Sequence, residues 1–120
     1  IFFGTGDGEL IALDARTGTP CADFGQGGRV DLKRSLRGTL KPGNYTITSP
    51  PAIVGEVVVI GSAIGDNQRS DEASGVVRGF DARSGAQRWS WDPVPQDPAD
   101  PAFATWENDS ARRTGAANAW

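Results

Sequence analysis

The sequence predicts an all-β fold, because glycine, proline and short β-branched runs dominate it. Sixteen glycines and eight prolines are spread along the 120 residues, and no apolar stripe with helical spacing runs uninterrupted between them. Short runs rich in β-branched or aromatic residues occur instead, each bounded by Gly, Pro, Asp or Asn. From these runs we expect strands at residues 1–3, 9–13, 46–54, 57–62, 76–80 and 88–91.

The two strands expected nearest the N-terminus are separated by a glycine-rich stretch, residues 4–8. Glycine provides the positive φ values that tight hairpin turns require. The spacing Gly4-x-Gly6-x-Gly8 differs from the glycine pattern of a dinucleotide-binding loop, and we expect no helix after it. This stretch therefore predicts a β-hairpin.

A turn motif occurs twice, each time at the end of an expected strand. The motif Asp-Ala-Arg-(Thr or Ser)-Gly spans Asp14 to Gly18 and recurs from Asp81 to Gly85. In both copies the Asp side chain can accept hydrogen bonds from backbone N–H groups, and the Gly can adopt a positive φ. Another expected strand precedes each copy, so the repeating unit is strand, loop, strand, Asp turn and strand. Such a unit is typical of a β-propeller blade.

The repeat divides the chain into successive stretches. We expect residues 1–45 to be the end of one blade plus an insertion loop, residues 46–92 to be the next blade, and residues 93–120 to be a Pro- and Asp-rich connection. The two motif copies lie farther apart than the ~40–50 residues of a typical blade, so we place the excess in insertions at 24–44 and 65–74. The prolines of the connection prevent it from pairing as a central strand. The chain would then hold about one and a half blades of a partial β-propeller.

Composition and charge exclude several classes of function. Twelve Lys and Arg residues against fifteen Asp and Glu residues give a net charge of −3, which argues against binding along a nucleic-acid backbone. The lack of histidine and the single cysteine, Cys21, exclude His-based triads, an internal disulfide and a Cys-based zinc site within these residues. The longest apolar run, residues 57–60, is too short to span a bilayer. Because the sequence contains no methionine, we expect it to be a piece of a longer protein.

The second Asp turn continues into a tryptophan. The pattern G-x-D-x-x-S-G-x-x-x-W runs from Gly79 to Trp89. It resembles the tryptophan-docking motif of the pyrroloquinoline quinone (PQQ) dehydrogenases, a family in which eight four-stranded blades form a propeller and each blade's tryptophan packs into its neighbour. The first copy of the motif has Ala22 where the tryptophan would stand. We expect Trp89 to be the docking residue, and Trp91 and Trp106 to be structural.

A longer ordered string narrows the resemblance. It comprises ITSPP at 47–51, the strand at 57–62, GDNQ at 65–68, SGVVRGFD at 74–81 and NAW at 118–120. This string resembles the membrane-bound glucose dehydrogenase branch, which also includes quinate-type enzymes. The resemblance implies an enzyme fragment whose parent oxidises a small sugar or polyol, foremost glucose to gluconolactone, with PQQ as hydride acceptor and ubiquinone as electron acceptor. It also implies the periplasmic face of the bacterial inner membrane, with any membrane anchor outside this chain.

A PQQ site needs a hard cation, hydrogen-bond donors and a flat apolar surface, because the cofactor is a planar tricarboxylate quinone. Calcium or magnesium suits it, since both prefer oxygen ligands and act as Lewis acids. The resemblance implies that Asp66 is a metal ligand, with Asn67 beside it as a second oxygen donor. The alternative is that the pair caps a surface turn, where Asp and Asn commonly occur.

The resemblance assigns cofactor contacts to Thr48, Gly65 and Trp120. Thr48 matches a threonine whose hydroxyl bonds the cofactor, although a strand-edge Thr is equally compatible with β propensity. Gly65 belongs to the same string as Asp66. Trp120 matches the tryptophan that stacks against the PQQ ring, and a core or docking tryptophan is its alternative. No residue matches the family's catalytic aspartate, so we expect no catalytic residue in this chain.

Two other functions stay open. One is a PQQ-type alcohol dehydrogenase with a fused or partner cytochrome c, and the other is a non-enzymatic propeller scaffold of the outer-membrane assembly type. Either way we expect the isolated chain to be inactive and poorly folded, because an excised piece of a propeller exposes docking faces and strand edges that neighbouring blades would cover.

Overall fold

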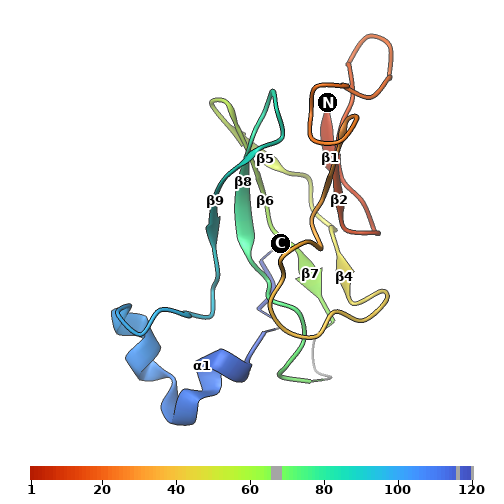
Figure 1. Ribbon diagram of the computed structural model, residues 1–120. Helices are drawn as coiled ribbons and strands as arrows, with labels where there is room; N and C mark the ends of the chain where they lie inside the picture. The colour runs from red at the N-terminus through yellow and green to blue at the C-terminus, as the bar shows by residue number, and fades with distance from the viewer. Residues whose placement is uncertain (66–68, 116, 120) are drawn as a thin grey trace.

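The computed structural model describes residues 1–65, 69–115 and 117–119, and short antiparallel strands make up most of its regular structure (Figure 1). A three-stranded sheet has the order β1 (Phe2–Gly4), β2 (Glu9–Ala12) and β3 (Arg29–Asp31). A four-stranded sheet has the order β5 (Ala52–Val54), β6 (Val57–Ile60), β8 (Val77–Asp81) and β9 (Gln87–Trp91). A separate two-stranded ladder pairs β4 (Tyr45–Thr46) with β7 (Ala63–Ile64). The predicted all-β fold is confirmed.

The four-stranded sheet is an antiparallel meander. Each of its strands pairs with the next one in the sheet, and Val58 of β6 lies opposite Phe80 of β8. Val58, Ile60 and Phe80 are buried, whereas β9 is exposed along its whole length at the outer edge. Four antiparallel strands in chain order are the construction of a propeller blade.

The first hairpin forms as the sequence predicts. β1 and β2 pair antiparallel, with Phe3 opposite Ile11. In the connecting turn, the backbone N–H of Gly8 donates to the carbonyl of Thr5 at 3.1 Å, and the Thr5 hydroxyl accepts from the N–H of Glu9 at 3.1 Å. Gly8 has a φ of 72°, which is the backbone conformation that glycine adopts without strain.

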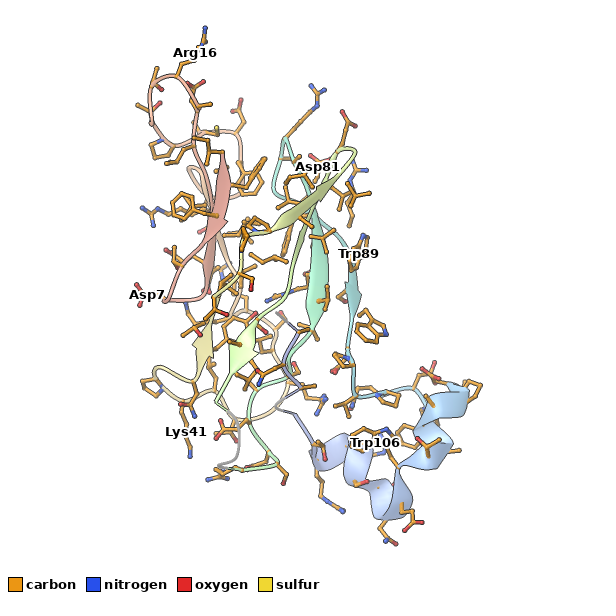
Figure 2. All side chains as sticks on the ribbon, turned by 180° about the vertical axis from the view of Figure 1, so that it is seen from behind. Asp7, Arg16, Lys41, Asp81, Trp89 and Trp106 are labelled. Atoms are coloured by element: carbon orange, nitrogen blue, oxygen red, sulfur yellow. The ribbon has the colours of Figure 1, made fainter. Side chains whose placement is uncertain are left out.

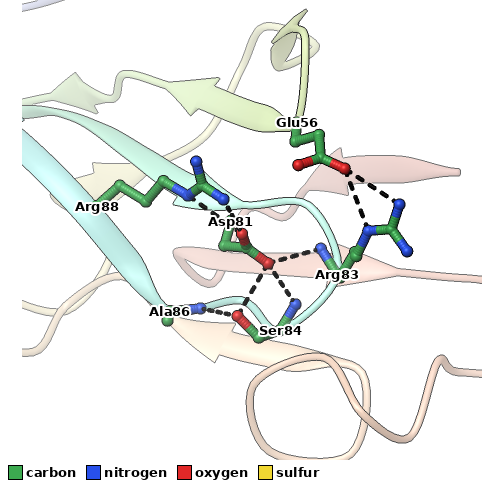
Figure 3. A network of polar contacts seen from close by, with 6 residues as sticks. All are labelled: Glu56, Asp81, Arg83, Ser84, Ala86 and Arg88. Atoms are coloured by element: carbon green, nitrogen blue, oxygen red, sulfur yellow. Dashed lines mark hydrogen bonds and ion pairs between the residues drawn. The ribbon is translucent and has the colours of Figure 1, made fainter.

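Both Asp turns have the predicted geometry. Oδ1 of Asp81 accepts hydrogen bonds from the backbone N–H of Arg83 at 3.0 Å and of Ser84 at 2.8 Å, and Arg88 binds Oδ2 (Figure 3). Oδ1 of Asp14 accepts the two equivalent backbone bonds in the first copy, at 2.9 and 3.0 Å. The N–H of Ser84 and the Arg88 guanidinium stabilise the ionised form, so the pKa of Asp81 lies well below its ordinary value.

Several elements differ from the prediction. The expected strand at 46–54 is divided into β4 and β5, since the two consecutive prolines between them have no N–H to donate to a ladder. β3 lies inside the expected insertion at 24–44, and its pairing with β2 is a long-range contact that local patterns do not reveal.

The expected connection at 93–120 contains short helical turns. These are η1 (Pro101–Thr105), η2 (Glu107–Asp109) and α1 (Ser110–Arg113), and they lie away from the sheets in Figure 1. Asp100 caps the first turn by accepting from the N–H of Ala102 at 2.9 Å, and Pro101 occupies its first turn. None of the helices among the described residues has the length and apolar character that crossing a membrane requires.

An apolar core joins the two larger sheets. Its buried members come from both sheets and from the segments between them: Leu10, Ala12, Phe24, Leu32, Tyr45, Ile47, Val58, Ile60, Ile64, Ala73 and Phe80. The second Asp turn also contacts the first sheet's loop directly, because the N–H of Gly25 donates to the carbonyl of Ser84 at 2.8 Å. A Cβ on Gly85 would lie 2.7 Å from the nitrogen of Gly25, so only glycine permits this approach.

Candidate functional site

The structure describes the predicted site residues only in part. Asp66, Asn67 and Trp120 lie outside the described residues, whereas Thr48 and Gly65 lie within them. The segments that lead into the other predicted residues are described up to Gly65 and Ala119. The candidate site is therefore defined by Thr48, Gly65 and the described residues next to the other three.

The β4–β7 ladder sets the relative positions of Thr48 and Gly65. Tyr45 pairs with Ile64 and Thr46 with Ala63, so the chain runs past Thr48 at one end of the ladder and past Gly65 at the other. The N–H of Gly65 donates to the carbonyl of Asn44 at 3.0 Å. With a rise of about 3.3 Å per residue, Thr48 and Gly65 lie roughly 13 Å apart along the ladder. The candidate site is elongated.

Thr48 lies on a surface hollow that the C-terminal segment completes. The hollow has a volume of about 190 Å³ and is lined by Thr48, Ser49, Pro50, Ala52, Val59, Gly61, Ser62 and Ala119. Ala119 is held there by a two-bond bridge, in which its carbonyl accepts from the N–H of Ser62 at 3.0 Å and its N–H donates to the Ser62 carbonyl at 3.2 Å. The structure thus brings together Thr48 and the residue that precedes Trp120.

Two glycines make room for the C-terminal segment. A Cβ on Gly61 would lie 1.6 Å from the carbonyl oxygen of Ala119, and a Cβ on Gly75 would lie 1.5 Å from that of Ala117. Any side chain at either position would displace the segment. Sequence reasoning missed this role, although Gly61 lies inside the expected strand 57–62, and a glycine within a strand often marks the close approach of another backbone.

Glu72 lies at the other end of the site and was also missed. It is fully buried, and its Oε2 accepts a hydrogen bond from Nδ2 of Asn44 at 3.3 Å. Its Oε1 has no hydrogen-bond partner among the residues that the structure describes. A Cβ on Gly65 would lie 3.0 Å from Cγ of Asn44, so the amide group sits directly against the backbone that continues into Asp66. The available signal was an acidic residue in a stretch of small residues close to the predicted metal ligands.

The donor set fits a hard divalent cation. Carboxylate and amide oxygens are the ligands that calcium and magnesium prefer, and Asp66 and Asn67 carry these groups. In the part of the chain that the structure describes, Oε1 of the buried Glu72 has no hydrogen-bond donor, and this carboxylate is linked through Asn44 to Gly65. Among the described residues, no group of three or more His, Cys, Asp or Glu side chains could hold a metal ion by itself. Asp66 and Asn67, which lie outside the described residues, stay the predicted ligands.

The loops around Glu72 are tied to one another. The carbonyl of Arg37 accepts from the N–H of Ser74 at 2.7 Å, and the N–H of Gly115 donates to the carbonyl of Ser70 at 2.8 Å. Arg37 also pairs with Asp92 at 3.0 Å, where both side chains are largely shielded from water. These contacts hold the two expected insertions, at 24–44 and 65–74, and the connection at 93–120 against one end of the blade.

Trp89 lies over the glycine of its own blade. A Cβ on Gly79 would lie 2.3 Å from the Trp89 ring, while Trp89 remains 41% exposed and Trp91 59% exposed. Figure 2 shows Trp89 beside β9, the outer strand of the four-stranded sheet. One face of the indole is therefore free to meet a neighbour, as a docking role requires.

Comparisons with known proteins identify the family of the chain. A family model described as the β-propeller domain of glucose, ethanol and alcohol dehydrogenases (PQQ) matches residues 1–120. The glycerol dehydrogenase large subunit of Gluconobacter oxydans is 43% identical over 120 residues, which are 100% of this chain and 16% of that protein. The quinate/shikimate dehydrogenase (quinone) of Acinetobacter baylyi is 42% identical over 98 residues, which are 82% of this chain and 12% of that protein.

Two further similarities support the same family. The quinoprotein glucose dehydrogenase of Escherichia coli is 40% identical over 98 residues, again 82% of this chain and 12% of that protein. A solved structure of the quinohemoprotein alcohol dehydrogenase ADHIIG from Pseudomonas putida HK5 has a TM-score of 0.67 and 30% identity, covering 95% of this chain and 16% of that one. The chain thus spans 12–16% of the length of these relatives. The predicted partial β-propeller is confirmed, and the chain belongs to the PQQ-dependent (quinoprotein) dehydrogenase family, within its β-propeller domain.

Proposed function

We propose that the whole protein oxidises a small sugar or polyol, foremost glucose to gluconolactone, and passes the electrons to ubiquinone at the periplasmic face of the bacterial inner membrane. The names of the relatives support the substrate class, since they refer to glycerol, to quinate or shikimate, and to glucose. Each of these compounds carries several hydroxyl groups on neighbouring carbons. In this proposal residues 1–45 complete one blade, residues 46–92 form the next, and residues 93–120 connect it to Trp120.

The observation that carries the proposal is the hollow shared by Thr48 and Ala119. Two segments far apart in the sequence converge there, and each leads to a residue that the family resemblance assigns to the cofactor. We place one end of PQQ at this hollow, where the exposed Thr48 can donate its hydroxyl to a cofactor carboxylate. Trp120 would cover the ring plane, burying a large apolar face.

The opposite end of the elongated site would hold the metal. Asp66 and Asn67 would bind Ca²⁺ or Mg²⁺ through their side-chain oxygens, just beyond the point where Gly65 packs against Asn44. When bound, PQQ accepts a hydride and the cation polarises a quinone carbonyl. The residues of this chain would bind and orient the cofactor, and the catalytic base would come from the rest of the protein.

The metal role is tested by Asp66→Ala in the whole protein. The apoprotein is titrated with PQQ and Ca²⁺, and the variant should lose most of the Ca²⁺-dependent gain in PQQ affinity because one charged ligand is missing. Asp97→Ala, on an exposed loop, is the matched control and should behave as the wild type. An Asp66→Ala protein with the wild-type response to Ca²⁺ would contradict the assignment.

The substrate class is tested by PQQ-dependent dye reduction with glucose, glycerol, quinate and ethanol. The proposal expects glucose to give the highest kcat/KM. A preference for ethanol would favour the alcohol dehydrogenase alternative. The similarity to the solved quinohemoprotein alcohol dehydrogenase is the observation that supports this alternative. If PQQ binds weakly and supports no dye reduction with any substrate, the non-enzymatic scaffold becomes the better description.

A further inference from the structure

Glu72 is a carboxylate buried in the segment between β7 and β8. It is 0% exposed, although glutamate is almost never fully buried unless it is paired. Within the described part of the chain, its Oε2 accepts one hydrogen bond, from Asn44, and its Oε1 accepts none. Removing such a group from water destabilises the fold unless a positive charge compensates for it.

Two basic side chains of the neighbouring segments form ion pairs with other acids, although the charge of Arg69 also acts on Glu72. Arg69 binds Asp71 through two of its nitrogens, and Arg37 pairs with Asp92 at 3.0 Å. Across the described parts of the chain, no ion pair includes Glu72. A cation bound beside this segment would add positive charge that no ion pair of Glu72 supplies.

Asn44 connects Glu72 to the chain that leads into the metal ligands. Its carbonyl accepts from the N–H of Gly65 at 3.0 Å, and its side-chain amide lies against Gly65 while it donates to Glu72. The carboxylate therefore fixes the orientation of the Asn44 amide, and Asn44 fixes the backbone at Gly65. Its charge lies one amide group away from the start of the proposed metal-binding segment.

We propose that Glu72 and Asn44 form the outer shell of the metal site. Glu72 contributes negative charge that favours a bound divalent cation, and Asn44 positions the backbone at Gly65. This inference rests on the proposed metal role of Asp66 and Asn67. Both residues are positioning residues, and the loss of such an outer-shell partner typically weakens metal affinity by about 10- to 100-fold.

The test uses Glu72→Gln in the whole apoprotein. Glutamine keeps the shape of the side chain and an oxygen that can accept from Asn44, so the variant removes mainly the charge. Calorimetric titration should show Ca²⁺ affinity weakened by about 10- to 100-fold. The unfolding midpoint without Ca²⁺ should equal or exceed that of the wild type, because the variant no longer buries an uncompensated charge. A purely structural residue would instead lower this midpoint.

Two more variants complete the design. Asn44→Ala should also weaken Ca²⁺ binding, because the backbone at Gly65 loses its support. Glu56→Gln is the control, since Glu56 is exposed and forms an ion pair with the exposed Arg83 near the second Asp turn. Its Ca²⁺ affinity and its unfolding midpoint should both equal those of the wild type.

The outcomes separate this inference from the function on which it rests. If Asp66→Ala abolishes Ca²⁺ binding while Glu72→Gln and Asn44→Ala bind Ca²⁺ as the wild type does, the outer-shell assignment is wrong and the metal role stands. A lower midpoint for Glu72→Gln with unchanged Ca²⁺ affinity also overturns the assignment. If Asp66→Ala itself binds Ca²⁺ normally, the metal role is wrong and the outer shell fails with it.

Discussion

Replacing Gly61 with alanine tests how the C-terminal segment is held beside Thr48. The added Cβ would lie 1.6 Å from the carbonyl oxygen of Ala119. A carbon and a carbonyl oxygen in close contact are normally about 3.3 Å apart, so the segment would have to retreat by roughly 1.7 Å. That movement would break the bridge between Ser62 and Ala119.

The size of the effect follows from what the bridge contains. It consists of two backbone hydrogen bonds, of 3.0 and 3.2 Å. Each such bond contributes about 0.5–1.5 kcal/mol net, so the free energy of unfolding should fall by about 1–3 kcal/mol. Overpacking of a close contact costs a similar amount, about 1–3 kcal/mol. PQQ affinity should fall as well, because Ala119 and Thr48 line the same hollow.

The assay compares Gly61→Ala with Gly6→Ala in the whole protein. Gly6 has no atom within 4 Å of its would-be Cβ, so alanine there adds a methyl group without a clash. Denaturant unfolding gives the free energy, and a PQQ titration gives Kd. If Gly61→Ala matches Gly6→Ala in both measurements, the proposed close packing of the C-terminal segment is refuted.

Two further predictions concern stability. Asp81→Asn should reduce the loss of stability on acidification. In the wild type, the N–H of Ser84 and the Arg88 guanidinium lower the pKa of Asp81 in the folded state. The stability that Asp81 contributes is therefore complete above its unfolded pKa of about 3.9 and is lost as the pH falls through the lower folded pKa. Urea unfolding at pH 7 and at about pH 3 measures this, and an unchanged pH dependence would count against it. The isolated chain should aggregate because Val54 and Trp91 leave apolar surface exposed at both sheet edges, and a sharp cooperative melt would show otherwise.

Features that depend on neighbours in the sequence were predictable. An Asp three residues before a Thr or Ser and four before a Gly closes its own turn, so both copies of the motif have the expected hydrogen bonds at Asp14 and Asp81. The first hairpin follows from glycine spacing in the same way. The helical turns after Pro101 also had a local signal, an Asp-Pro start, which the surrounding prolines obscured.

Features that depend on distant segments were not predictable. β3 appears as an insertion in the sequence because its partner β2 lies across a long loop. Gly61 is one residue of an expected strand until Ala119 is placed against it, and Glu72 resembles any surface acid until its burial is known. No local pattern distinguishes a buried glutamate from an exposed one.

The order of turn and strand residues was by itself enough to determine the all-β class and the Asp turns, since these follow from backbone preferences over a few residues. The family followed from the resemblance of longer sequence motifs. Folding alone decided that Ala119 would lie beside Thr48 and that Asn44 would link Glu72 to Gly65. The physical reason is that such contacts arise from packing between segments far apart in the chain, where burial and the close approach of two backbones select the partners.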